Sequence, residues 1–475
     1  MDISEVNLDR AKDLFFKSIQ HQEEGNLFEA KILLEKAHEI YPNRDSIINN
    51  LLVIYFSLKD YDGLNSFLLK LKPETSYYII CDIYIDYFNK NFENCIKKAT
   101  LNFNKFENIQ SQLIDISAKC YFAIGDISKL FKSLRESLKN KNLYSQNLFN
   151  VGNFLLHLSK PRAGKYFIEK SLSLAPNQSY HSSLAHCYLQ IKNFDKGLDL
   201  WESRWIFNHQ FILFKNLPKL ESLQSIANKK VVVWFEQGLG DTLNFARYVK
   251  VLKRYCSDIS FVVQDKLLEI FAFFDEDIKI LSYSNAEKIN FDYQISIISL
   301  MRLLKINYDQ INYKKIDIKK NIQKNKFFLK NIGFANSGNA EFFTDNYRSI
   351  DPDIFSSLFK NENINFFKLH SNTEQKFKAF SNVTDLGHLS ITEVANKIFE
   401  LDLIITTDTF LVHLCGFLNI NCILILNYNS DWRWFDDRKY TKWYPSVKII
   451  KQKKLLDWAS VIKIIDRFLK LNSKI

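Results

Sequence analysis

The chain has 475 residues, enough for about three domains. Its 47% hydrophobic and 25% charged residues exclude a disordered chain, and 12 glycines with 7 prolines exclude a collagen-like one. The formal net charge is 64 − 53 = +11 at pH 7, with the lysines spread along the chain, so we favour a compositional bias over a nucleic-acid-binding surface.

Residues 1–207 are expected to form a helical repeat domain. In the clearest unit, residues 25–43, small or apolar residues recur at helical spacing (Ala30, Leu34 and Ala37) before Pro42 ends the helix. The spacing returns in residues 164–176, and weaker copies follow a period of about 34 residues. This pattern predicts tetratricopeptide (TPR) repeats, which serve either as a partner-binding surface or only as a packing scaffold.

The repeat is lost in residues 208–228, which we interpret as a linker. Beyond it, β-rich runs alternate with helical segments such as 391–400 and 410–418, which predicts parallel sheets with crossover helices. The β-rich runs are 231–236, 259–264, 293–298, 327–336, 364–370, 401–407 and 421–427.

These patterns predict an α + α/β protein. A TPR helical solenoid is expected in residues 1–207, followed by the linker at 208–228. A first Rossmann-like lobe is expected at 229–310, and a second lobe, ending in a helix, at 311–475. A Lys- and Asn-rich stretch separates the two series of strands, and the lobes should face a cleft at the carboxyl ends of their strands.

The first candidate site is the Glu-Gln-Gly-Leu-Gly-Asp-Thr string between a strand and a helix. Gly238 and Gly240 permit a sharp turn and the close approach of a ligand, and Gln237 and Thr242 flank them. Asp241 would either cap the helix or act as a base, and the residues alone favour capping.

The second candidate site closes a later strand with Thr407, Asp408 and Thr409, before a helix that carries His413. Hydroxyls and N–H groups at a helix N-terminus suit a phosphate. His413 would either donate to a ligand oxygen or be a core residue, and a lone histidine on an apolar helix favours the core.

Two further segments are candidate binding sites. Asp431, Trp432, Arg433, Trp443 and Tyr444 combine aromatic faces for a sugar or base with a guanidinium for phosphate, or else they plug the core. The loop of Ser337, Gly338 and Asn339, with Arg348 nearby, is either an anion-binding loop or an ordinary turn.

No metal or disulfide framework is expected. The Asp-x-Asp strings at 275–277 and 351–353 are interpreted as an acidic loop and a helix start. The seven cysteines form no Cys-x-x-Cys pair and mostly lie in apolar stretches, so they predict core thiols in a reducing, cytoplasmic compartment. No secretory signal or membrane-spanning run is recognised.

The chain resembles bacterial TPR proteins that carry a C-terminal GT-B glycosyltransferase domain related to the heptosyltransferases. The matching strings are FDKGLDLWESRW, EQGLGDTLNFARYV, SGNAEFFTDNYRSI, LDLIITTDTFLVHLCGFLN and DWRWFDDRKYTKWYP, and the match covers about residues 190–460. The resemblance implies a GT-B fold, a nucleotide-sugar donor bound mainly by the second lobe, and no obligatory metal or other cofactor. Asp241 takes the place of the proposed base, and Asp408, Thr409 and His413 lie on the donor side.

The sequence departs from this family at four positions. Asn336, Phe342, Asn346 and Phe410 stand where the family commonly has Trp, His, Arg and a small residue, respectively. Two basic residues are therefore lost.

We therefore expect a metal-independent, inverting glycosyltransferase that acts on a protein or glycan acceptor held by the TPR repeats. Similar repeat-bearing enzymes glycosylate flagellin, so flagellin is one expected acceptor. The alternative is a TPR interaction scaffold with an inactive transferase domain, for which the lost basic residues argue. Nucleic acid is not an expected partner, no membrane span is expected, and self-association through the repeats stays open.

Overall fold

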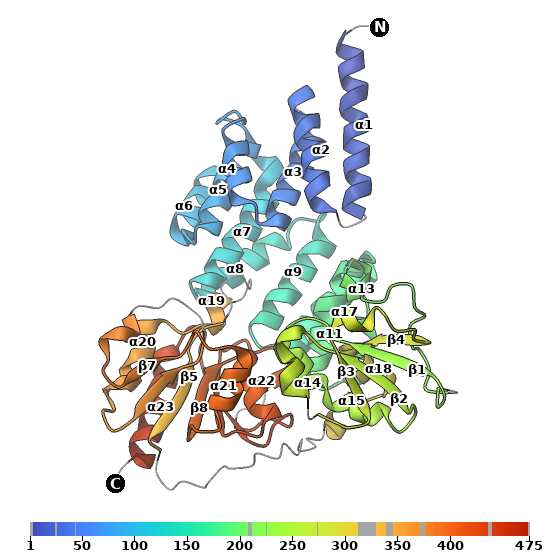
Figure 1. Ribbon diagram of the computed structural model, residues 1–475. Coiled ribbons are helices and arrows are strands. Elements are labelled where there is room, and N and C mark those ends of the chain that lie inside the picture. The colour runs from blue at the N-terminus through green and yellow to red at the C-terminus, as the bar shows by residue number, and fades with distance from the viewer. Residues whose placement is uncertain are drawn as a thin grey trace. The chain divides into compact units, whose positions relative to one another are not determined.

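The computed structural model describes residues 3–473 apart from 24–25, 43, 208–210, 225, 273, 312–328, 339–344, 371–375 and 436–438. Its contacts divide the chain into two compact units. Unit 1 comprises residues 1–151, 170–176 and 205–211, and unit 2 comprises residues 152–169, 177–204 and 212–475. Figure 1 labels the elements of both.

Unit 1 is built from helices in which each packs on the next along the chain. They are α1 (Ile3–Glu23), α2 (Leu27–Ile40), α3 (Asp45–Leu58), α4 (Tyr61–Leu68), α5 (Ser76–Phe88), α6 (Phe92–Asn102), α7 (Gln110–Ala123) and α8 (Ile127–Ser137). Ala30, Leu34 and Ala37 are completely buried, as the repeat spacing predicts. The predicted helical repeat architecture is confirmed.

The helical repeats continue into unit 2. Helices α9 (Tyr144–His157) and α10 (Pro161–Leu174) contribute residues to both units, and α13 (Arg204–Phe207) is likewise divided. Helices α11 (His181–Gln190) and α12 (Phe194–Trp201) belong wholly to unit 2. The last hairpin of the repeat region therefore shares a compact unit with the sheets.

The first sheet of unit 2 is parallel, with strand order β3-β2-β1-β4. Its strands are β1 (Lys230–Trp234), β2 (Asp258–Val262), β3 (Ile278–Leu281) and β4 (Tyr293–Ser296). The helices between and after them are α14 (Leu239–Phe245), α15 (Arg247–Leu252), α16 (Leu268–Phe271), α17 (Tyr283–Ala286) and α18 (Ile297–Leu303).

The second sheet is also parallel, with strand order β10-β9-β8-β5-β6-β7. Its strands are β5 (Asn331–Ala335), β6 (Asn365–Lys368), β7 (Val383–Asp385), β8 (Leu403–Thr407), β9 (Cys422–Leu426) and β10 (Val447–Lys451). The accompanying helices are α19 (Asp345–Arg348), α20 (Pro352–Phe355), α21 (Ile391–Lys397), α22 (Phe410–Phe417) and α23 (Trp458–Asn472). The predicted pair of Rossmann-like lobes is confirmed, although the boundaries predicted for the domains stay predictions.

The segment predicted to be a linker packs on the first sheet where the structure describes it. Leu220 and Ile226 are 2% exposed, and the Leu220 N–H donates to the carbonyl of Gln294 on β4 at 2.8 Å. Burial of these two apolar side chains fixes the segment against the edge of the sheet.

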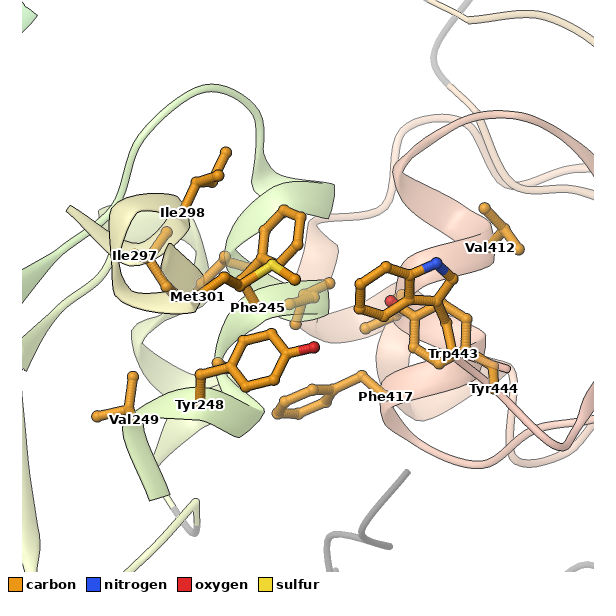
Figure 2. Packing of buried hydrophobic residues seen from close by; sticks show 14 of the residues in the cluster. Phe245, Tyr248, Val249, Ile297, Ile298, Met301, Val412, Phe417, Trp443 and Tyr444 are labelled. Carbon is orange, nitrogen blue, oxygen red and sulfur yellow. The ribbon is translucent and has the colours of Figure 1, made fainter. Parts of the chain in front are cut away.

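The two lobes of unit 2 share one hydrophobic core. Figure 2 shows Phe245 on α14 and Tyr248 on α15 facing Phe417, Trp443 and Tyr444 of the second lobe. All five side chains are almost completely buried, so this contact between the lobes has the packing of a protein interior.

The described cysteines are all buried and free, as predicted. Within the described residues, every helix is too short or too polar to cross a lipid bilayer.

Candidate functional site

The candidate site lies where the central strands of the two sheets end. In the first sheet, β4 lies on the opposite side of β1 from β2 and β3. In the second sheet, β8 lies on the opposite side of β5 from β6 and β7. The strand order therefore reverses beside β1 and between β5 and β8. In open parallel sheets, ligands bind outside the carboxyl ends of strands at such reversals.

The loop after β1 is fixed by the Asp241 carboxylate. Gly238 is the N-cap residue of α14, and its N–H donates to Asp241 Oδ2 at 3.1 Å. Gln237 adopts a left-handed backbone conformation (φ 61°), which is uncommon for a residue with a Cβ atom. The capping interpretation of Asp241 is confirmed, and a base role would have to coexist with it.

The same carboxylate forms a short ion pair with the second lobe. Asp241 Oδ1 lies 2.6 Å from Arg433 Nη2, and Arg433 Nη1 lies 2.8 Å from Asp431 Oδ1. Arg433 Nη2 also donates to Gln237 Oε1 at 3.1 Å. The guanidinium lies 4.8 Å from the ring centre of Trp432, a distance typical of cation–π contact. Five of the predicted site residues therefore meet in one cluster.

Burial and charge shift the acid–base properties of this cluster. Burial raises the pKa of Asp241, although the Arg433 guanidinium opposes the rise. Burial also raises the pKa of Asp408 to about 6, and the nearby Asp431 carboxylate adds to the effect. Burial works against the charge on Asp431 too, but Arg433 and His186 together outweigh it and lower the pKa of that carboxyl. A carboxylate with a raised pKa is a better base.

Gly240 brings helix α14 against helix α22. A Cβ atom on Gly240 would lie 2.6 Å from Cδ2 of His413, so no other residue fits without moving that ring. The sequence predicts a tight turn or the close approach of a ligand at this glycine. The structure gives a third reason, the close packing of the two helices that follow the central strands.

His413 is held by a chain of hydrogen bonds. The Tyr444 hydroxyl donates to Asn244 Oδ1 at 2.9 Å, and His413 Nδ1 lies 2.9 Å from the same hydroxyl oxygen. Because the hydroxyl proton is used by Asn244, Nδ1 carries the ring proton and Nε2 is an acceptor. Burial, with a contribution from Arg433, lowers the pKa of His413 to about 3, so the ring is neutral at physiological pH.

The loops after β5 and β8 are joined by Arg348. Its Nη1 donates to the carbonyl of Asp408 at 3.0 Å, and its Nε pairs with Asp345 at 2.8 Å. The Gly338 N–H donates to Ser349 Oγ at 3.1 Å. The N–H predicted to bind an anion is therefore used within the protein, and Ser337 lies beside it in the same loop.

Thr409 begins helix α22 as its N-cap residue. Its hydroxyl accepts from the Leu411 N–H at 3.3 Å and lies 3.0 Å from the Thr406 hydroxyl. Thr407 is completely buried, and within the described residues its hydroxyl has no hydrogen-bond partner.

Several predicted site residues are buried in the protein interior, and Trp432 of the cluster is one of them. Thr242 is buried and donates to Gln264 Oε1 at 2.8 Å. Trp432, Trp443 and Tyr444 are at most 1% exposed, as expected of the core plug that the sequence analysis left open. Their contact with a ligand stays a prediction. Asn339 lies outside the described residues.

The two Asp-x-Asp strings have structural partners. Asp275 and Asp277 both pair with Lys253, at 2.8 and 2.6 Å. Asp351 is the N-cap residue of α20, with Pro352 in the first turn, as predicted. Among the described residues, no group of three or more His, Cys, Asp or Glu side chains is placed to hold a metal ion.

Sequence reasoning missed several residues that support the site. Arg247 Nη1 donates to the Trp443 carbonyl at 2.8 Å, which ties the loop of Arg433 to helix α15. Arg204 pairs through two nitrogens with Glu236, the second residue after β1. Asn244 and Arg247 share the sequence string of Asp241, but only the tertiary structure reveals their partners.

Comparisons with known proteins find similarity only among solved structures. No family model and no curated protein matches the sequence. The structural neighbours include a family 9 glycosyl transferase from Veillonella parvula, with TM-score 0.39 and 14% identity, covering 53% of this chain and 99% of that one. They also include the E. coli heptosyltransferase WaaC with ADP, with TM-score 0.36 and 11% identity, covering 51% and 100%. A TPR protein from Thermus thermophilus has TM-score 0.28 and 11% identity, covering 42% and 93%. Scores and identities this low carry no argument about function.

Proposed function

We propose that this chain is a glycosyltransferase that moves a sugar from a nucleotide-sugar donor to a hydroxyl of a protein or glycan acceptor. The observation that carries the proposal is the contact between Gly240 and His413. It brings the loops that follow the central strands of two parallel sheets together, with a buried carboxylate and a guanidinium between them. The sequence resemblance to GT-B transferases supports the same conclusion.

The proposed reaction uses Asp241 as its base. The acceptor oxygen attacks the anomeric carbon, its proton passes to the Asp241 carboxylate, and the bond between that carbon and the phosphate oxygen of the donor breaks. The phosphate leaves with the bonding electron pair, near Arg433 and the N-terminus of α22. A single displacement inverts the configuration at the anomeric carbon, and neutral His413 would accept a hydrogen bond from a sugar hydroxyl through Nε2.

The TPR repeats are proposed to bind the protein acceptor, with flagellin as one candidate. Helical repeats bind partners along an extended surface, and a transferase that acts on a protein needs such a surface. We propose that the protein acts in the cytoplasm without a metal or other cofactor.

A transfer assay with labelled donors tests this function. Purified protein is incubated with radiolabelled UDP-, GDP-, ADP- and CMP-sugars and with lysate from a strain that lacks the protein. Asp241→Asn is expected to reduce label transfer at least about 100-fold, the usual contribution of a general base. The matched control is Glu393→Gln, because Glu393 also accepts the N–H of a helix N-cap residue, at 2.8 Å. Undiminished transfer by folded Asp241→Asn would exclude the base, and absence of transfer by the wild type with every donor would favour the scaffold.

A further inference from the structure

Arg433 holds the candidate base in an ion pair. Its side chain is about nine-tenths buried. Its two terminal nitrogens form ion pairs with Asp241 and Asp431 and donate a hydrogen bond to Gln237. An acceptor hydroxyl would have to approach Asp241 while Oδ1 is paired at 2.6 Å and Oδ2 caps α14. In this arrangement both carboxylate oxygens are engaged, and the cation paired with Oδ1 makes that oxygen a weaker base.

Two residues beside this ion pair adopt uncommon backbone conformations. Gln237, which accepts from Arg433, has φ 61°, and Phe435, two residues after Arg433, has φ 49° and ψ −145°. The second combination is one that residues other than glycine rarely adopt, so the backbone is strained there. The strained residues lie on both sides of the Asp241–Arg433 pair, one in each lobe.

The guanidinium is also incompletely satisfied. Its Nε is buried and, within the described residues, has no hydrogen-bond partner. A guanidinium has five N–H donors and pairs most strongly with an oxyanion that accepts two of them at once. Because a phosphate oxygen could accept from Nε and a neighbouring terminal nitrogen together, the unused donor favours a phosphate ligand.

We propose that the phosphate of the donor nucleotide displaces Asp241 from Arg433 and so releases the base only when the donor is bound. The inference rests on the proposed function and deepens it, because it assigns the order of binding. The donor binds first and takes over the guanidinium. Asp241 Oδ1 then becomes free to accept the proton of the acceptor hydroxyl. Deprotonation of an acceptor hydroxyl before the donor is bound is prevented as a result.

The test is a double-mutant cycle on nucleotide affinity. ADP, UDP, GDP and CMP are titrated by calorimetry into the full-length wild type, Asp241→Asn, Arg433→Gln and the double variant. The three diphosphates and the monophosphate distinguish the two kinds of leaving group. Asp241→Asn should tighten binding of the preferred nucleotide about tenfold, because Arg433 no longer has to leave a charged partner. Arg433→Gln should weaken binding about tenfold or more.

The decisive comparison is the effect of Asp241→Asn on nucleotide affinity in the wild type and in the Arg433→Gln background. If the carboxylate acts by competing for the guanidinium, its removal has no effect in the Arg433→Gln background. An equal gain in both backgrounds would overturn the proposal, because it would indicate plain repulsion between Asp241 and the phosphate. Wild-type affinity in Arg433→Gln, or no binding of any of the four nucleotides, would overturn it as well.

Control variants distinguish the displacement of Asp241 by the donor phosphate, which we call the gate, from effects on folding or on the sugar-transfer reaction. Glu393→Gln removes a matched capping carboxylate elsewhere in unit 2 and should leave nucleotide affinity unchanged. If Arg433→Gln does not fold, Arg433→Lys replaces it, because a single ammonium lacks the planar fork and should also weaken binding. Nucleotide binding with the expected coupling but no sugar transfer would leave the gate standing and exclude the proposed reaction. Sugar transfer by the wild type, together with unchanged nucleotide affinity in Asp241→Asn, would exclude the gate but not the proposed reaction.

Discussion

At the level of single residues, Gly238 and Gly240 look alike in the sequence but have different structural roles. Gly238 has φ −84° and an added Cβ would lie 3.5 Å from its nearest neighbour, Asp241 Oδ2, which is an ordinary contact. Gly240 has a histidine ring 2.6 Å from where its Cβ would be. The difference between them is a matter of tertiary packing, which the Gly-x-Gly string does not reveal.

Alanine substitution should separate the two glycines. Gly240→Ala is expected to lower the free energy of unfolding by about 1–3 kcal/mol, since the His413 ring must move within a packed interior. Gly238→Ala is expected to cost less than about 1 kcal/mol, the usual loss at an N-cap. Urea denaturation followed by tryptophan fluorescence measures both. Equal costs would contradict the assigned roles.

Asp408 should make stability depend on pH. Its pKa of about 6 in the folded state lies above the unfolded value of about 3.9, so the folded state holds a proton that the unfolded chain has lost between these pH values. The stabilising contribution of this group is therefore full below pH 4 and lost as the pH rises through 6. The free energy of unfolding of Asp408→Asn, relative to wild type, should rise by about 2–3 kcal/mol between pH 4 and pH 7. Denaturant titrations across that range measure it, and a constant difference would show that folding does not shift the pKa of Asp408.

At the level of elements, the sequence pattern predicted the buried strands and the edge strand β4, but it missed the other three edge strands. The apolar runs around β1, β5, β8 and β9 are buried along almost their whole length, and each was recognised. The strands β3, β7 and β10 were missed because they are partly exposed, which weakens the apolar signal, whereas β4 is buried over three of its four residues. The helix predicted after the Gly-x-Gly string is found as two pieces, α14 and α15.

The join between the last repeat helices and the first sheet depends on Arg204. Its Nε and Nη2 lie 2.9 and 2.7 Å from the two oxygens of Glu236, and its Nη1 lies 2.8 Å from Glu202 Oε1. Both Arg204 and Glu236 are buried. Sequence reasoning could not pair two charges that stand 32 positions apart, although the string that contains Arg204 was noticed.

Removal of this guanidinium should destabilise unit 2. Arg204→Met is expected to lower the free energy of unfolding by about 3–5 kcal/mol, because it leaves a buried carboxylate without a partner. The exposed pair of Arg302 and Asp199, at 2.6 Å, is the matched control, and Arg302→Met should cost less than about 1 kcal/mol. Tryptophan fluorescence suits the measurement, since six of the seven tryptophans lie in unit 2 and only Trp205 lies in unit 1. Similar costs for both variants would show that Arg204 is no more than a surface charge.

At the scale of the whole molecule, the sequence predicted the two kinds of architecture but not the site's internal pairing. The repeat spacing and the alternation of strands and helices were sufficient for the fold. The sequence strings that contain Asp241 and Arg433 were each recognised as candidate sites. Their ion pair was not predicted, because it joins residues that are 192 positions apart. Such a contact depends on how two lobes pack, and that packing rests on buried side chains such as Phe245 and Trp443 (Figure 2).

A comparison of glycopeptides tests the central claim of sugar transfer to a protein most directly. Proteins from a strain that lacks this chain are compared by mass spectrometry with those from the same strain carrying the wild type or Asp241→Asn at equal abundance. The account predicts a glycan mass on at least one protein, flagellin among the candidates, with the wild type and its loss with Asp241→Asn. Identical glycopeptides in all three strains would contradict the account.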